Sequence, residues 1–95
     1  MSTATNIGTL IVSTPDICGG RPRIAGRRIS VEQISVLHKQ GLTPDNIKNE
    51  YEGVSLEQIY AAIAYYYANQ QEIETYLDED KKEYDRLMLE FRKED

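Results

Sequence analysis

The sequence predicts a small, mainly α-helical domain: a three-helix core of helix-turn-helix type (winged-helix-like or homeodomain-like), with a short N-terminal β element and an extended C-terminal helix. Segments 30–33 and 55–58 both have the pattern Ser-x-x-Gln, which matches the capping box that opens many helices. Apolar residues at helical spacing follow each of them. Between them, Thr43 and Pro44 match an N-cap followed by proline at the first helical position. Three helix starts in succession therefore define the core.

The N-terminal part of the chain has the pattern of a short strand and a turn. Residues 10–12, Leu-Ile-Val, form an apolar run rich in β-branched side chains, which is typical of a strand. Ile24 and Ile29 flank the sequence Ala-Gly-Arg-Arg, whose composition suits a tight turn or a small hairpin. The first helix is then expected to follow Ser30 and to stop at Gly41, because glycine is favoured just after the last helical residue.

The next two helices have the spacing of a helix-turn-helix unit. The second is expected to be short, from Asp45 to about Tyr51, with Ile47 and Tyr51 as its inward pair. A link of about four residues separates it from the third helix, which is expected to follow Ser55. This pair of helices is the element that would approach DNA if the protein binds DNA.

From residue 59 onward, apolar residues recur at alternating spacings of four and three, which indicates a coiled-coil-like seam. Gln70 and Asp80 interrupt this seam with polar side chains. The segment 78–80, Asp-Glu-Asp, together with Glu83, also resembles a new helix start. The C-terminal part is therefore either one long helix or two helices in series. We divide the chain into a disordered N-terminus (1–8), a helix-turn-helix core (9–70) and an acidic helical extension (71–95).

The charge of the chain is unevenly placed. The net charge is −5 over 95 residues, but residues 1–28 carry +3 and residues 71–95 carry −5. Such a field disfavours nonspecific nucleic-acid binding by the whole chain. Cys18 is the only cysteine, so no internal disulfide forms, and no apolar run is long enough to cross a membrane. With no secretory signal either, we expect a cytoplasmic protein without a membrane partner.

The arginines of segment 19–30 are the main candidate binding residues. Arg21, Arg23, Arg27 and Arg28 are expected to form a positive edge that contacts nucleic acid or a partner, because guanidinium groups bind phosphates and carboxylates. The alternative is that one or two of them pair with carboxylates inside the fold, Arg28 above all. Gln58 is a candidate for contacting adenine, although its capping-box role competes with this. The first turns of the third helix contain no lysine or arginine, which is evidence against strong DNA binding.

Several segments together resemble the prokaryotic domain-of-unknown-function family 433. They are Gly20-Arg21-Pro22-Arg23-Ile24-Ala25-Gly26-Arg27-Arg28-Ile29-Ser30-Val31, Gly41-Leu42-Thr43-Pro44-Asp45-Asn46-Ile47, Tyr51, and Val54-Ser55-Leu56-Glu57-Gln58-Ile59-Tyr60-Ala61-Ala62. The family motif is met at Pro22, Ile24, Gly26, Arg28, Ile29 and Val31. Arg27 stands where the family has threonine, Gly53 stands near its usual proline, and Val54 stands at its usual leucine. The resemblance covers about residues 10–70. It implies a small helix-turn-helix domain, an antitoxin-like role beside a PIN-like ribonuclease toxin, and no catalytic residue.

These observations predict a non-enzymatic binding protein. The first hypothesis is an antitoxin-like chain that masks a ribonuclease toxin and binds operator DNA to repress its own genes. The alternative is a structural or adaptor homodimer that binds protein only. A homodimer is expected through the C-terminal helix or through exchange of the N-terminal strand. The expected protein interface comprises Ile73, Leu77, Tyr84, Leu87 and Phe91. A lone histidine, His38, and a lone cysteine make no metal site or nucleophile pair, so we expect no cofactor and no small-molecule substrate.

Overall fold

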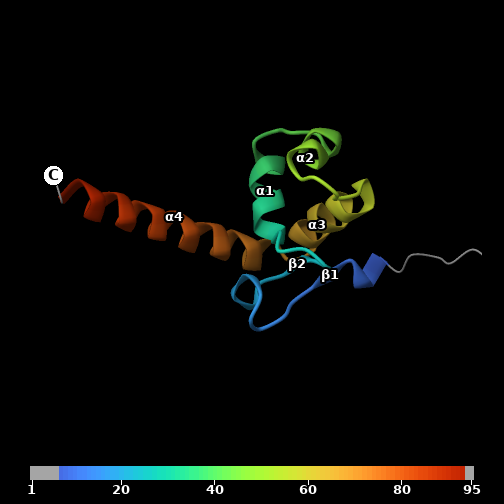
Figure 1. Ribbon diagram of the computed structural model, residues 1–95, viewed down its shortest axis with the longest axis horizontal. Helices are drawn as coiled ribbons and strands as arrows, with labels where there is room; N and C mark the ends of the chain where they lie inside the picture. The colour runs from blue at the N-terminus through green and yellow to red at the C-terminus, as the bar shows by residue number, and fades with distance from the viewer. Residues whose placement is uncertain (1–6, 94–95) are drawn as a thin grey trace, which may run out of the picture.

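The computed structural model describes residues 7–93 and confirms the fold class predicted from the sequence (Figure 1). Within this range the chain forms a two-stranded sheet, two single 3₁₀ turns and four α-helices. In chain order the elements are η1 (Ile7–Thr9), β1 (Ile11–Val12), η2 (Cys18–Gly20), β2 (Arg23–Ile24), α1 (Val31–Lys39), α2 (Pro44–Glu50), α3 (Leu56–Ala68) and α4 (Gln70–Lys93). The first three helices and the sheet pack together, while α4 leads away from them, so that the molecule measures 63 × 29 × 24 Å.

The helix starts lie where the sequence predicts them. Ser30 caps α1 and Ser55 caps α3, each in a complete capping box in which the serine side chain and the glutamine three residues later exchange hydrogen bonds with the backbone. Thr43 caps α2 and accepts a hydrogen bond from the backbone amide of Asn46. Gly41 follows the C-cap of α1 with φ of +95°, a left-handed conformation that favours glycine.

The N-terminal sheet is an antiparallel pair in which Ile11 lies opposite Ile24 and Val12 lies opposite Arg23. The predicted turn after β2 is also present. The amide of Arg27 donates to the carbonyl of Ile24 at 3.0 Å. Gly26, at the third position of this turn, has φ of +80°, as a type II turn requires. This short sheet places the arginine-rich segment against α1 and α3.

A single apolar core lies between the helices and the sheet. Its buried members are Ile24, Ile29, Val31, Ile34, Ile47, Val54, Ile59, Ala62, Tyr66 and Ile73. They come from every α-helix, from β2 and from the loops that precede α1 (Ile29) and α3 (Val54), so the core joins β2 and all four helices. None of the helices within residues 7–93 has the length and apolar character needed to cross a membrane.

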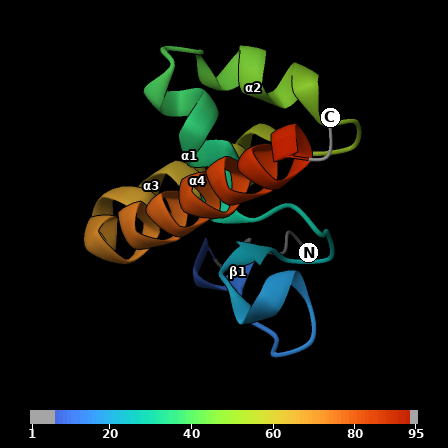
Figure 2. The same ribbon diagram turned by 90° about the vertical axis from the view of Figure 1, so that its left-hand side faces the viewer.

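The break in the C-terminal helical region lies at Asn69 and not at residues 78–80, where the sequence suggested one. Asn69 has φ of −134° and ψ of 45°, and its amide is shared between the carbonyls of Tyr65 and Tyr66. The helix α4 then runs without interruption from Gln70 through the acidic cluster. In Figure 2 the projecting helix faces the viewer. The acidic cluster does not end the helix because side chains from the domain and from the next turn neutralise it, as described below.

Two features of the structure bear on the domain boundaries predicted from the sequence. The core does not end at residue 70, because Ile73 of α4 is completely buried in it. The predicted disordered segment 1–8 falls mostly outside the described residues, but Ile7 and Gly8 of that segment form η1 together with Thr9.

Candidate functional site

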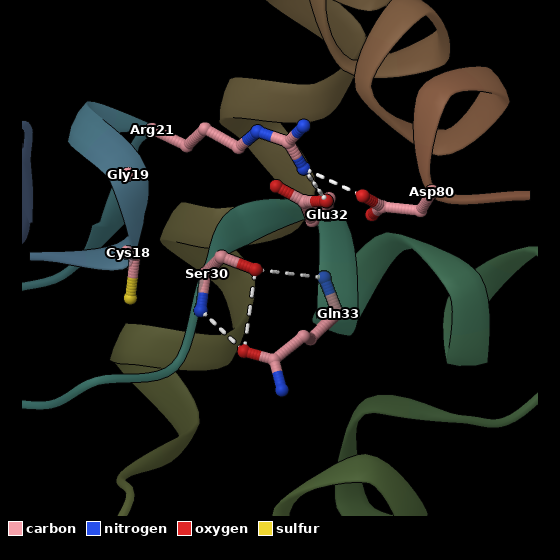
Figure 3. Close-up of a pocket in the computed structure, with 7 residues that line it drawn as sticks. All are labelled: Cys18, Gly19, Arg21, Ser30, Glu32, Gln33 and Asp80. Carbon is pink, nitrogen blue, oxygen red and sulfur yellow. Dashed lines mark hydrogen bonds and ion pairs between the residues drawn. The ribbon is translucent and has the colours of Figure 1, made fainter. Parts of the chain in front are cut away.

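Arg21 joins three segments of the fold at one point (Figure 3). Its Nη1 atom lies 2.5 Å from Oε2 of Glu32 on α1 and 2.8 Å from Oδ1 of Asp80 on α4. Its Nη2 atom lies 3.4 Å from Oε1 of Glu79, and its guanidinium carbon lies 4.6 Å from the ring centre of Tyr76. We call Arg21, Glu32 and Asp80 the Arg21 cluster. It ties the N-terminal loop, the first helix and the last helix together.

The backbone before Arg21 explains how this side chain reaches both helices. Cys18, Gly19 and Gly20 all have positive φ, at 53°, 63° and 80°. Two of the three are glycines, which adopt such angles without steric cost, whereas Cys18 is a rare non-glycine case. The amide of Arg21 donates to the carbonyl of Cys18 at 3.1 Å and closes this tight turn. The turn reverses the chain and directs Arg21 toward α1 and α4.

Burial and crowding perturb the two carboxyl groups of the Arg21 cluster in opposite directions. The side chain of Glu32 is only 8% exposed. Burial raises the pKa of Glu32 to about 7, and its hydrogen bond with Asp80 adds to this, while the charge of Arg21 opposes it. The pKa of Asp80 is lowered by its hydrogen bond with Glu32 and then by its hydrogen bond with Arg21. Below neutral pH Glu32 therefore retains its proton, whereas Asp80 is ionised and can accept that proton in a hydrogen bond.

An open depression of about 570 Å³ lies over this cluster. It is lined by Cys18, Gly19, Arg21, Ser30, Glu32, Gln33 and Asp80. The arginine in it is already bonded to carboxylates, so it has no free charge for an anion. Within residues 7–93 no group of three histidine, cysteine or acidic side chains is arranged to hold a metal ion.

The structure does not gather the four arginines into one positive edge. Arg21 is bound by carboxylates, as described above. Arg23 is buried, at 8% exposure, and donates to the carbonyl of Arg27 at 3.1 Å and to the hydroxyl of Thr14 at 3.0 Å. The prediction that Arg23 lies at an exposed edge was therefore wrong. Its guanidinium is buried and joins Thr14, which precedes β2, to the turn that follows β2.

The other two arginines lie closer to the surface. Arg27 is half-buried against the turn between α2 and α3, where its Nη2 atom donates to the carbonyl of Glu52 at 2.7 Å. Arg28 is exposed, and its side chain makes no hydrogen bond or ion pair with any residue in the range 7–93. The alternative that Arg28 pairs with a carboxylate inside the fold was therefore wrong, and Arg21 takes that role.

Gln58 and the exposed face of α3 offer little for DNA. The Oε1 atom of Gln58 accepts from the amide of Ser55 at 2.8 Å, so its amide is committed to the capping box. The exposed side of α3 carries Tyr60 and Tyr67, at 57% and 59% exposure. A shallow depression beside Tyr60 is lined by Glu57, Tyr60, Ala61 and Ala64. The face that would enter the major groove is thus apolar with one acidic residue, and α3 contains no lysine or arginine.

The predicted interface seam divides into two parts at Asp80. Ile73 is completely buried in the chain's own core, and Leu77 packs against that core, so neither is free for a partner. Tyr84, Leu87 and Phe91 are 63%, 50% and 67% exposed. We call residues 70–80 the inner half of α4 and residues 81–92 the outer half.

Sequence reasoning missed two features of these sites. Met88 lies on the same exposed face as Tyr84, one helical turn away. The four-residue spacing between them in the sequence was the signal that could have predicted this. Glu32 and Asp80 were not recognised as partners of Arg21. They lie 11 and 59 positions away from it, and no local pattern connects residues so far apart.

The fold is that of a small, mainly helical domain with a short N-terminal sheet and a projecting C-terminal helix. The family model described as "Protein of unknown function (DUF433)" matches residues 11–66, and the chain belongs to this family. A crystal structure of a DUF433 member protein from Anabaena variabilis ATCC 29413 is similar, with a TM-score of 0.69 and 31% sequence identity. The similarity covers 74% of this chain and 69% of that chain. No curated protein matches the sequence.

Proposed function

We propose that this protein is a non-enzymatic, antitoxin-like binding protein that covers a partner protein with the outer half of α4. One observation supports this above the others: a helix that leaves the domain carries an uncovered apolar stripe. Tyr84, Leu87, Met88 and Phe91 occupy positions i, i+3, i+4 and i+7 of this helix, and all are exposed. That spacing is the one by which an amphipathic helix enters a groove of another protein.

The stripe has a physical reason to be buried elsewhere. Covering one large apolar side chain contributes roughly 1.5–3 kcal/mol. A helix that extends into water has only its own hydrogen bonds and local ion pairs to stabilise it, which is marginal over such a short length. Lys82 pairs with Asp78, and Arg86 pairs with Glu83 and Glu90. These pairs keep the free helix formed until a partner supplies the missing packing.

The negative charge of the C-terminal segment lies mainly at the domain end of α4. Residues 71–80 hold five acidic residues and no basic residue, whereas the outer half, 81–92, holds four basic and three acidic residues and carries +1. Glu83 and Glu90 flank the stripe on one side. Because complementary charge selects between partners, this balanced surface does not by itself select a basic partner. The proposal that the partner is a toxin of the ribonuclease class therefore rests on the family resemblance and not on charge.

Self-association through the same stripe is less well supported. Tyr84 and Phe91 occupy equivalent heptad positions, with Leu87 between them, so the seam spans less than two heptads. In an antiparallel pair of α4 helices, Glu83 of one copy would face Glu90 of the other and like charges would meet. A protein-only adaptor homodimer remains the second hypothesis. It is favoured by the exposed face of α3, which lacks the cations that DNA binding needs.

Operator binding is the least supported part of the antitoxin hypothesis. Of the four arginines predicted to form a positive edge, only Arg27 and Arg28 lie where a phosphate could approach them. Gln58 is held in a capping box. Autoregulation by direct DNA contact would therefore depend on Arg27 and Arg28 and on a second DNA-binding chain in the complex.

Co-expression with the product of the adjacent gene tests the proposal. We expect a stable complex in affinity purification and light scattering, and relief of any growth arrest that the neighbour causes. Replacing Leu87 and Phe91 together by aspartate should abolish both the complex and the relief of growth arrest. The control is Leu89→Asp, which makes the same kind of change at an exposed leucine of the outer half that lies outside the stripe. A homodimer that forms no complex with the neighbour, or a complex that is unchanged by the double substitution, would reject the proposal.

A further inference from the structure

The inner half of α4 is attached to the domain at both of its ends. Near its start, Ile73 is buried in the core, and Glu74 accepts hydrogen bonds from Lys39 at 2.7 Å and from Tyr66 at 2.5 Å. At its end, Asp80 and the neighbouring Glu79 bind Arg21. Only one residue lies between α3 and α4, and it has a non-helical conformation. The direction of α4 therefore depends on these side-chain contacts rather than on a continuous helix.

The Arg21 cluster is the outermost of these attachments. Beyond Asp80, residues 81–92 are all exposed. Their ion pairs join α4 to itself, and within residues 7–93 no ion pair or hydrogen bond connects the outer half to the rest of the domain. The cluster thus marks the point beyond which the helix has left the domain.

Acidic groups outnumber basic groups at the Arg21 cluster. One guanidinium serves three carboxyl groups, those of Glu32, Glu79 and Asp80. Glu32 and Asp80 both accept a hydrogen bond from the same nitrogen atom, Nη1 of Arg21, so their carboxyl groups lie close together. Two carboxyl groups that share one site do not both ionise easily, so one retains its proton to a higher pH. Glu32 is the better protected from water of the two.

We propose that Arg21, Glu32 and Asp80 form a latch that a shared proton keeps closed, and that opens to release the inner half of α4 as the pH rises above neutrality. With the proton present, Glu32 donates to Asp80, and Arg21 neutralises the remaining negative charge. Without it, two adjacent carboxylates repel each other across the joint between α1 and α4. A pKa of about 7 for Glu32 places this change in the physiological range.

The other groups facing the latch support this assignment. They are Cys18 from the N-terminal loop, and Tyr76 and Glu79 from α4. Glu79 adds negative charge and so favours opening at high pH. The ring of Tyr76 lies against the guanidinium and keeps Arg21 in place in either state. Apart from Glu32, the groups at the start of α1 that line the depression are Ser30 and Gln33, which are neutral.

The latch would control how the protein presents its binding helix. A closed latch holds the outer half in one direction, so that a partner meets a preorganised surface and loses less entropy on binding. An open latch leaves α4 attached through its first turns only. This consequence for partner binding rests on the proposed function, whereas the latch itself is a property of the isolated chain.

Hydrogen–deuterium exchange of the free protein tests the latch. The readout is the protection of amides 74–80 at pH 6 and pH 8, corrected for the chemical exchange rate. A group with a pKa of about 7 in the closed state and an ordinary pKa in the open state changes the opening equilibrium roughly tenfold over this range. We therefore expect the protection of amides 74–80 in α4 to be about tenfold lower at pH 8 than at pH 6. The amides of α3 should remain better protected than these at both pH values. A carbon-13 titration of Glu32 should show its carboxyl changing near pH 7.

Matched variants separate the latch from general charge effects. Glu32→Gln keeps a hydrogen-bond donor without a titration, so α4 should stay protected at both pH values. Arg21→Met keeps the alkyl stem but removes the charge, so α4 should lose protection even at pH 6. Glu83→Gln is the control, because Glu83 is also paired with an arginine but lies on the outer half. It should behave as the wild type does.

Three results would overturn the latch. They are a Glu32 titration at the ordinary value, an unchanged protection of α4 between pH 6 and pH 8, and protection of α4 equal to that of α3 at both pH values. The last would mean that α4 opens only when the whole domain unfolds. None of these measurements involves a partner. If the Leu87 and Phe91 substitutions leave a partner complex intact, the proposed function fails while the latch stands.

Discussion

The guanidinium of Arg27 lies directly against Gly53, so that a Cβ atom at residue 53 would come within 2.8 Å of Nη1 of Arg27. The same arginine donates to the carbonyl of Glu52. The end of the Arg27 side chain therefore occupies the space that a Cβ atom at residue 53 would need, and a side chain there would displace it.

This contact predicts the effect of Gly53→Ala. Gly53 has φ of +81°, so alanine there adds backbone strain and also displaces Arg27 from Glu52. Gly41→Ala is the matched control, because Gly41 has φ of +95° but no atom near its missing Cβ. We expect Gly53→Ala to cost about 1 kcal/mol more than Gly41→Ala in denaturant unfolding, which is the worth of one hydrogen bond. When Arg27 is also replaced by alanine, Gly53→Ala and Gly41→Ala should cost the same free energy of unfolding. A difference that persists without Arg27 would contradict the assigned contact.

The two halves of α4 should respond differently to truncation of apolar side chains. Ile73→Ala leaves a cavity in the core and is expected to lower the free energy of unfolding by about 2–5 kcal/mol. Leu87→Ala removes an exposed side chain and should change it by less than about 0.5 kcal/mol in the isolated chain. Thermal melts followed by circular dichroism decide this. Equal effects would mean that the outer half is packed in solution.

Substitution of Arg23 should destabilise the domain far more than substitution of Arg28, although both belong to one arginine-rich segment. Arg23→Met leaves the hydroxyl of Thr14 and the carbonyl of Arg27 without their donor, so we expect a loss of about 1.5–3 kcal/mol. Arg28→Met should be close to neutral for stability. If DNA binding is found, the loss of DNA retardation should follow Arg28 instead. A stable Arg23→Met variant would show that the buried guanidinium does not support the hairpin.

The stability of the domain should fall as the pH rises from 6 to 8. Glu32 has a pKa of about 7 in the folded chain against an ordinary value of 4.5, so the folded state binds its proton more tightly than the unfolded state. The resulting stabilisation is complete below about pH 4.5 and is lost as the pH rises through 7. Melting temperatures measured across this range should decline for the wild type and remain level for Glu32→Gln. A level wild-type profile would contradict the assignment.

Acidification should have a separate effect through Glu74. Hydrogen bonds from Lys39 and then from Tyr66 lower the pKa of Glu74, so this carboxylate stabilises the fold above its ordinary pKa and ceases to do so when it is protonated. We expect Glu74→Gln to weaken the wild-type domain at pH 6 but to reduce its sensitivity to pH below 4. Urea titrations at several acidic pH values would measure this. An acid sensitivity identical to that of the wild type would exclude Glu74 as its source.

The sequence by itself determined the elements of this protein. Capping boxes, an N-cap followed by proline, and a glycine stop are local signals, because each depends on hydrogen bonds between residues at most a few positions apart. They placed the starts of α1, α2 and α3 correctly, as well as the turn after β2. The motif between residues 20 and 62 was sufficient to assign the family.

Only the tertiary structure decided what the charged and apolar side chains of those elements do. Four arginines of similar appearance in the sequence became one ion-pair centre, one buried brace, one contact to a turn and one exposed cation. A seam with uniform spacing became half core and half exposed stripe, because the chain bends at Asn69 and the domain covers α4 only as far as Asp80. Burial and pairing arise from residues distant in sequence, such as Arg21 and Asp80, and no local spacing encodes them.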